Sequence, residues 1–297
     1  VPETAPGYIY PPQLSDLIFL PDGSRLLTAH DDGTVRVWDP ETRREVRRFK
    51  SHGLGHSAYL ACSADGKWVA VGGRDRVVSV WELATGRQVI KFDGHHAEVT
   101  QVAFTRDGHG LISSADLSPV LWDLCPKELP TLDGPADALW EVLAAEDAAK
   151  PYRLQWALAR NPKAAVKLFT AHVDPGNQSL ERAKFDKLAG DLDGPRFAVR
   201  EKAEKDLVAT GHRIPVAWLR QALSEAKSDD LRTRLTRVLA TREKPAADER
   251  RLSRAVQALE LAATDEARAL LKSWANAADG TLLAVESKAA LGRLVTK

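Results

Sequence analysis

The sequence has no methionine and only two cysteines in 297 residues. A chain of this length ordinarily contains several methionines, so we expect a fragment of a longer reading frame, or one begun at an alternative start codon. Cys62 and Cys125 are too few and too far apart for a disulfide framework or a short metal-binding motif. We therefore expect both to be reduced thiols.

A strong charge of either sign is also missing, because the net charge is +1. Residues 1–134 carry 14 Lys and Arg against 18 Asp and Glu, and residues 135–297 carry 28 against 23. Neither balance has the clustered positive charge that a nucleic-acid surface needs. No apolar run approaches the ~18 residues of a membrane span. We expect a cytoplasmic protein with no nucleic-acid or membrane partner.

Recognisable catalytic motifs are absent as well. The chain has neither a Gly-x-Ser-x-Gly elbow nor a phosphate-binding Gly-x-x-x-x-Gly-Lys-Ser/Thr loop. The acidic stretch DDGTVRVWD spreads Asp31, Asp32 and Asp39 along a turn and a strand, whereas hydrolysis by paired carboxylates needs two acids opposed across a cleft. The sequence predicts no enzyme, no catalytic residue and no cofactor.

Six of the eight histidines lie in the first half, which raises the question of a zinc site. Zinc ligands usually recur at short spacing on one element. The pair in SHGLGH has the right spacing, but two glycines lie between its members, so a helix is not expected there. We predict no metal at these histidines: His52, His56, His95, His96 and His109.

The first half does contain an internal repeat of about 42 residues. Asp-Gly pairs begin at Asp22, Asp65 and Asp107, and tryptophans follow at the same period. After each tryptophan the next apolar residue before a turn is Phe49, Phe92 or Leu132. Such a period is typical of repeat architectures.

Each unit has the signals of antiparallel strands: Asp-Gly turns, alternation of polar and apolar residues, and β-branched side chains. In the first unit, strands are expected over 17–19, 25–28, 34–38 and 45–49. Four-stranded sheets repeated at this period are propeller blades. We predict a multidomain all-β plus all-α protein, in which residues 1–134 form three four-stranded blades over about 8–50, 51–93 and 94–134.

The agreement of period, Asp-Gly, Asp-x-Ser/Thr and Trp-Asp resembles WD-repeat propeller blades over residues 8–134. In that family a histidine, a turn aspartate, a hydroxyl and the tryptophan form a hydrogen-bonded chain that stiffens the blade. The resemblance implies this structural network: Asp32, Thr34 and Trp38 in the first unit; His52, Asp75 and Trp81 in the second; His95, Asp116, Ser118 and Trp122 in the third.

Only the third unit has the full set. The first has Tyr10 near the histidine position, and the second has Val77 where a hydroxyl is expected. Asp31 is expected to face solvent. The resemblance also implies that partners bind loops at the narrow face of the propeller, near Leu54, His56, Ser57, Arg74, His96 and Ala97.

Three blades cannot close a ring, since propellers have about four to eight. We expect an open partial propeller, with missing blades upstream of Val1 or a second chain covering the open edge.

Beyond about Gly134 the apolar period changes to 3.6 residues, which predicts a helical domain over 135–297. Residues 178–295 resemble HEAT-like helical repeats, and the alternative is a helical bundle. Tryptophans are expected to anchor its core: Trp140, Trp156, Trp218 and Trp274. Arginines could form a basic stripe, although a solvated mixed face is favoured: Arg196, Arg200, Arg232, Arg234 and Arg237.

Two extended surfaces without a catalytic group predict a protein–protein interaction scaffold or adaptor. The arrangement resembles bacterial multi-blade WD-repeat proteins with a helical extension. The alternative is the regulatory or sensor region of an enzyme or transcription regulator whose catalytic or DNA-binding domain lies upstream of Val1. Fold by itself does not decide between these functions.

Overall fold

A computed structural model of the chain describes residues 12–51, 58–115, 118–177, 180–241 and 245–295. The chain divides into two compact units. The sheet unit contains residues 1–126 with 147–149, and the helical unit contains 127–146 with 150–297. The division falls at Pro126, earlier than the expected boundary at residue 134.

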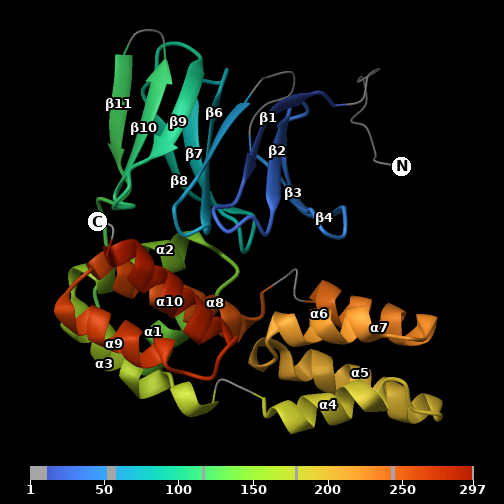
Figure 1. The fold of residues 1–297 in the computed structure, drawn as a ribbon. Helices are drawn as coiled ribbons and strands as arrows, with labels where there is room; N and C mark the ends of the chain where they lie inside the picture. The colour runs from blue at the N-terminus through green and yellow to red at the C-terminus, as the bar shows by residue number, and fades with distance from the viewer. Residues whose placement is uncertain (1–11, 52–57, 116–117, 178–179, 242–244, 296–297) are drawn as a thin grey trace. The chain divides into compact units, whose positions relative to one another are not determined.

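Three antiparallel sheets follow one another in the sheet unit (Figure 1). The first contains β1 (Leu14–Phe19), β2 (Leu26–His30), β3 (Thr34–Asp39) and β4 (Arg44–Lys50). The second contains β5 (Ala58–Cys62), β6 (Trp68–Gly73), β7 (Val77–Glu82) and β8 (Arg87–Asp93). The third contains β9 (Val99–Phe104), β10 (Gly110–Ala115) and β11 (Ser118–Asp123). This confirms the prediction of three successive blades in an open propeller.

The third sheet has three strands in the described residues, not the four that were predicted. Leu132 was expected at the position of Phe49 and Phe92, but it lies outside any strand and packs against a core of the helical unit. Proline explains the difference, because it cannot donate to a strand ladder. Pro119 lies in the edge strand β11 itself, and Pro126 and Pro130 interrupt the segment that follows.

The Asp-Gly pairs form the same turn in all three sheets. Gly23, Gly66 and Gly108 have φ of 71°, 70° and 75°, a left-handed conformation that glycine adopts without steric cost. In each turn the aspartate accepts the backbone N–H two residues further on, at 2.9 to 3.0 Å. Because these contacts are local, the repeat is visible in the sequence.

Successive sheets pack face to face. Leu27, Val35 and Phe49 of the first sheet share a buried core with Leu60 and Val69 of the second. Between the second and third sheets, side chains of β9 lie against Gly72 of β6. A Cβ there would lie 2.6 Å from Cγ1 of Val99. Glycine therefore allows the third sheet to pack this closely on the second.

The helical unit begins with α1 (Ala136–Val142), α2 (Ala149–Arg160) and α3 (Pro162–His172), followed by a short 3-10 helix over Pro175–Asn177. Next come α4 (Arg182–Asp191), α5 (Phe197–Thr210), a second 3-10 helix (Gly211–Arg213), α6 (Val216–Glu225) and α7 (Asp229–Thr241). The last helices are α8 (Ala247–Ala262), α9 (Asp265–Ala275) and α10 (Leu282–Val295). The predicted helical domain is thus present.

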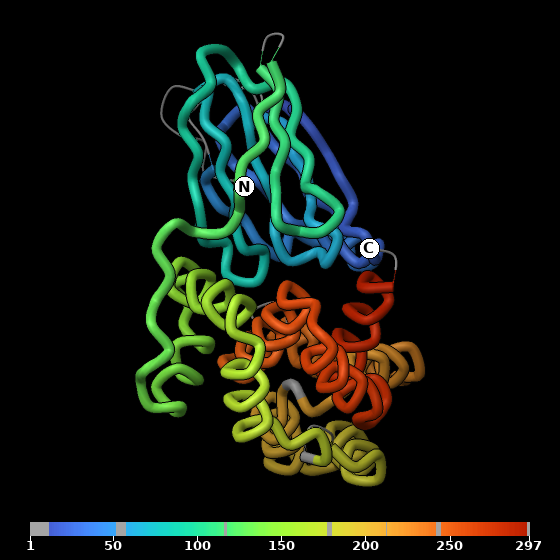
Figure 2. Tube along the Cα trace, turned by 90° about the vertical axis from the view of Figure 1, so that its left-hand side faces the viewer, coloured from blue at the N-terminus to red at the C-terminus, as the bar shows by residue number. Residues whose placement is uncertain are grey.

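Two separate cores stabilise these helices. One joins the beginning and the end of the unit, with α1–α3 packed against α8–α10, as the green and red segments of Figures 1 and 2 show. The other lies within α4–α7, where α4 packs on α5 and α6 on α7. Residues 178–295 are therefore not one continuous stack. The HEAT-like assignment stays a prediction, and helical hairpins of the kind it requires occur over α4–α7.

The tryptophans contribute to both cores. Trp156 and Trp274 are buried, while Trp140 packs at the edge of the first core and Trp218 at the edge of the second. Phe169 contacts both Trp140 and Trp274. Large aromatic rings bury much apolar area, which suits this anchoring role.

A buried arginine links the two ends of the first helical core. Arg254 of α8 is 2% exposed and donates to the carbonyl oxygens of Leu143 and Ala145, just after α1, at 2.8 and 2.7 Å. The last carbonyls of a helix lack partners within the helix. A cation there satisfies them and interacts favourably with the helix dipole.

Within the described residues, every helix is too short or too polar to cross a membrane.

The close approach at Gly72 yields a test. Gly72→Ala should lower the free energy of unfolding by about 1–3 kcal/mol, because the added methyl group overlaps Val99 and Val102. The measurement is urea unfolding followed by circular dichroism. The matched control is Gly292→Ala in α10, where an added Cβ meets no atom within 4 Å. It should stabilise the chain by about 0.5–1 kcal/mol. Equal effects of the two substitutions would contradict this packing.

Candidate functional site

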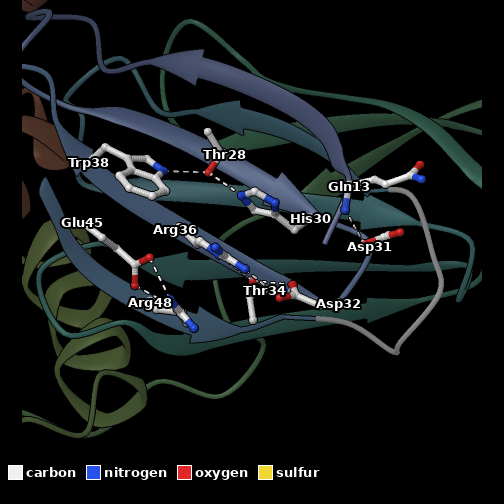
Figure 3. Close-up of polar contacts among 10 residues, drawn as sticks. All are labelled: Gln13, Thr28, His30, Asp31, Asp32, Thr34, Arg36, Trp38, Glu45 and Arg48. Atoms are coloured by element: carbon white, nitrogen blue, oxygen red, sulfur yellow. Dashed lines mark hydrogen bonds and ion pairs between the residues drawn. The ribbon is translucent and has the colours of Figure 1, made fainter. Parts of the chain in front are cut away.

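The turn between β2 and β3 holds the acidic stretch singled out in the sequence (Figure 3). Oδ1 of Asp32 accepts the backbone N–H of Thr34 at 2.9 Å and also the Thr34 hydroxyl. Oδ2 accepts from Arg36 at 2.8 Å. Asp32 is thus a turn carboxylate, as predicted, and its oxygens are used in structural contacts.

These contacts determine the charge of Asp32. Burial by itself would raise the pKa of this carboxyl, but the hydrogen bonds from Thr34 and Arg36 outweigh it and hold the pKa below its ordinary value of 3.8. The carboxylate is ionised at neutral pH. A general acid needs a raised pKa, so Asp32 is unsuited to that role.

Asp31 was expected to face solvent, and this was only partly right. It is half-buried, and its Oδ1 accepts the backbone N–H of Gln13 at 2.8 Å. The backbone N–H of Asp31 in turn donates to the carbonyl oxygen of Gln13 at 3.0 Å. Asp31 therefore connects the start of β1 to this turn (Figure 3).

A second group of hydrogen-bonded side chains in the same sheet consists of Trp38, Thr28 and His30. Nε1 of Trp38 donates to the hydroxyl of Thr28 at 2.8 Å, and Nε2 of His30 lies 2.9 Å from that hydroxyl (Figure 3). The histidine thus comes from the end of β2. Tyr10, which stands at the expected histidine position, lies outside the described residues.

The third sheet has the same group with a different histidine. Nε1 of Trp122 donates to the Ser113 hydroxyl at 2.6 Å, and Nε2 of His95 lies 2.6 Å from it. Ser113 is 1% exposed, so this hydroxyl has little access to water. Asp116 lies outside the described residues.

The second sheet uses another hydroxyl. Trp81 donates to Ser79 at 2.9 Å, and Ser79 lies on β7, two residues before the tryptophan. Val71 occupies the register position that Thr28 and Ser113 have in the other sheets. Asp75 accepts the N–H of Val77 in its turn at 3.3 Å. His52 is outside the described residues.

The predicted hydroxyl partners were therefore wrong: Trp38 bonds to Thr28 and not Thr34, and Trp122 to Ser113 and not Ser118. Thr34 lies four residues before Trp38 on one strand, about 13 Å away at the usual rise. Thr28 lies on the neighbouring strand opposite Arg36, diagonal to Trp38 on the same face. Strand register selects the partner, and a single-strand motif does not contain that information.

Both histidines are arranged to be neutral at physiological pH. Burial lowers the pKa of His30 and of His95, and nearby Arg36 and His96 respectively lower them further. A neutral imidazole has one nitrogen that can accept a hydrogen bond. Sequence reasoning overlooked His30, although the strand alternation of Thr28 and His30 places them on one face.

The candidate partner-binding residues are partly brought together. Arg74, in the turn between β6 and β7, lies 3.7 Å from Glu98, just before β9. Arg74 is 63% exposed, and His96 in the adjacent loop is also exposed. Ala97 is half-buried beside them. Leu54, His56 and Ser57 lie outside the described residues.

The arginines of the helical unit do not form a free basic stripe. Arg234 is buried and donates to Glu204 at 2.6 Å and Asp230 at 2.9 Å. Arg200 lies 3.2 Å from Asp230, and Arg232 donates to a backbone carbonyl oxygen. Two carboxylates, Glu204 and Asp230, thus pair with Arg234 and Arg200, in agreement with the mixed face that was favoured.

Cys62 and Cys125 are not joined in a disulfide in the described part of the chain, and both are thiols there. Burial raises the pKa of Cys62 to about 12, with Asp65 and Asp22 adding to the effect. A thiol is nucleophilic as the thiolate, so Cys62 is poorly reactive at neutral pH.

The Trp122 group gives a second prediction. Ser113→Ala leaves both the indole N–H and His95 without their buried partner, and should lower the free energy of unfolding by about 1–3 kcal/mol. Ser118→Ala, at the position that the sequence indicated, should change it by less than about 0.5 kcal/mol. Urea unfolding of both variants is the measurement. A larger loss in Ser118→Ala would overturn the assignment.

Asp32 gives a prediction about pH. Because its pKa is lowered in the folded chain, its contribution to stability is present above the ordinary value and is lost as pH falls through the folded value. Asp32→Asn should cost about 1–2 kcal/mol near pH 7, and the difference from the parent should shrink below about pH 4. Paired unfolding curves from pH 7 to pH 3 measure this. A difference that does not depend on pH would argue against the ionised contacts.

Comparison with known proteins agrees with this geometry. Residues 9–39, 44–82 and 86–123 match the family described as "WD domain, G-beta repeat". Over 108 residues the chain is 30% identical to human "U3 small nucleolar RNA-interacting protein 2", a match that covers 33% of this chain and 23% of that protein. The chain thus spans about a quarter of that relative's length.

Two solved structures are similar over 39% of this chain, each with 28% identity and a TM-score of 0.36. They are "Structure of U3-55K", 37% covered, and "Crystal structure of RRP9 WD40 repeats", 36% covered. The family match and the sheet register lead to one conclusion: the N-terminal part of this chain consists of three WD40 repeats, and a helical region follows it.

Proposed function

We propose that the chain is a non-catalytic scaffold or adaptor that binds proteins through its WD40 repeats. The observation that carries this proposal is the use of the conspicuous polar groups. Asp32, His30 and His95 are engaged in contacts that stabilise their own sheets, and the pKa of each group is lowered, by hydrogen bonds at Asp32 and by burial at the two histidines. These groups stabilise the repeats, and the exposed loops are left to bind a partner.

The surface that we propose for a partner is formed by Arg74, His96, Ala97 and Glu98. It joins the β6–β7 turn to the loop before β9, so it spans two neighbouring repeats. The side chains of Arg74 and Glu98 are 63% and 38% exposed, and water weakens such an ion pair, so little energy is needed to exchange it for contacts with a partner. Charged groups at such a rim mainly affect association rate and specificity.

A test compares three forms of the full chain in affinity purification followed by mass spectrometry. Arg74→Glu combined with His96→Ala should lose proteins that the parent chain retains. Arg87→Glu is the matched control, because Arg87 is an exposed arginine at the opposite end of the same sheet. It should retain them. If all three forms recover the same proteins, this surface is not the binding site.

The relative's printed name suggests a second candidate, association with an RNA-containing assembly. The acidic balance of residues 1–134 favours contact through a protein over direct contact with phosphates. RNA mobility shifts at several salt concentrations distinguish the two. Binding that weakens steeply with salt would indicate direct RNA contact and would weigh against a purely protein-binding role.

A further inference from the structure

Within the described part of the sheet unit, exposed large hydrophobic side chains are confined to the first and the last sheet. In the described part of the sheet unit they occur on β1 of the first sheet and on β10 and β11 of the third. The second sheet, which has a neighbour on both sides, has none. The exposed fractions are Leu14 52%, Leu17 49%, Phe19 56%, Ile112 42% and Leu121 69%.

Strand register shows that the exposed residues of the first sheet share one face. Leu17 pairs with Thr28, and Phe19 pairs with Leu26, which in turn pairs with Trp38. Directly opposed residues lie on the same side of a sheet. We call this side the leading face, defined by Leu14, Leu17, Phe19, Leu26 and Trp38.

The exposed residues of the third sheet also share a face. Ile112 of β10 pairs with Leu121 of β11 on one side and with Ala103 of β9 on the other. We call this side the trailing face, defined by Ala103, Ile112 and Leu121.

The register also shows what normally covers such faces. In the third sheet, the pair next to Leu111–Trp122 is Ile112–Leu121. In the first sheet, the pair next to Leu26–Trp38 is Leu27–Val37, so these two pairs occupy the same position in their sheets. Leu27 is 0% and Val37 6% exposed, because the second sheet covers them. The trailing face of the third sheet is therefore one half of an interface that the chain already forms internally.

The leading face is the other half of that interface. Leu26 pairs with the tryptophan of its sheet, as Val69 does in the second sheet and Leu111 in the third. Val69 and Leu111 are both completely buried, and Val69 lies in the core that the first and second sheets share. Each internal contact also includes a ring stack made by a phenylalanine of the fourth strand. Phe49 lies 5.0 Å from Trp81, and Phe92 lies 5.0 Å from Trp122, each at an interplanar angle of 24°.

We infer that a second copy of this chain covers these faces, with the leading face of each copy packed on the trailing face of the other. The described third sheet has no fourth strand, so the contact between copies is formed by the aliphatic faces. Two such contacts join two rows of three sheets into a closed ring of six. Six lies within the usual range of about four to eight blades. A head-to-tail contact that closes on itself gives a finite assembly, whereas one that remains open leads to filaments.

The first measurement is the mass of the full chain in solution by light scattering during size-exclusion chromatography. The expected mass at high concentration is twice the 32.5 kDa of one chain, with a shift toward one copy on dilution. A chain that stays at 32.5 kDa up to its solubility limit would overturn the inference.

Variants then test the geometry. Phe19→Asp on the leading face and Leu121→Asp on the trailing face should each abolish the dimer, because each removes both contacts of a homodimer. Val285→Asp in α10, at a residue of similar exposure (54%), is the control and should leave the dimer intact. Circular dichroism spectra that match the parent show that each variant folds.

Mixing the two variants is the decisive step. One contact remains possible, between the intact leading face of Leu121→Asp and the intact trailing face of Phe19→Asp. The mixture should therefore recover a dimer that dissociates at higher concentration than the parent. Association of either variant with itself, or failure of the mixture to associate while the parent dimerises, would rule out head-to-tail pairing.

Discussion

The contact between one sheet and the next is the constraint on which the sheet unit depends. Each internal contact combines a buried aliphatic face with a phenylalanine of an outer strand stacked on the next sheet's tryptophan. The same tryptophan must also satisfy its N–H, since an unpaired buried donor costs about 1–3 kcal/mol. One residue therefore links neighbouring sheets through its ring and holds its own sheet together through its nitrogen.

Because each tryptophan both stacks its ring and donates its N–H, the polar side chains around it have a structural role. The hydroxyls of Thr28, Ser79 and Ser113 lie where they can accept from an indole, although they come from different strands. The histidine that completes the group comes from β2 in the first sheet and from the loop before β9 in the third. The indole N–H needs an acceptor in every sheet, and residues at different positions supply it. Aligning the repeats by sequence therefore does not identify the hydrogen-bond partners of the tryptophans.

The helical unit depends on contacts between segments that are far apart in the sequence. Its first core is closed by contacts between segments about 100 residues apart, such as Gln155 with Gln257 and Arg254 with the end of α1. The α4–α7 segment has its own core, inserted between α3 and α8 in the sequence.

Local chemistry was readable from the sequence alone. The Asp-Gly turns, the 42-residue period, the alternating strands and the change to helical periodicity at about residue 134 depend on residues close together in the chain. The turn role of Asp32 belongs to the same class. Tertiary structure alone decided the hydroxyl partners of Trp38 and Trp122 and the packing of α1–α3 against α8–α10. These depend on strand register and on burial between distant segments, which a one-dimensional pattern does not specify.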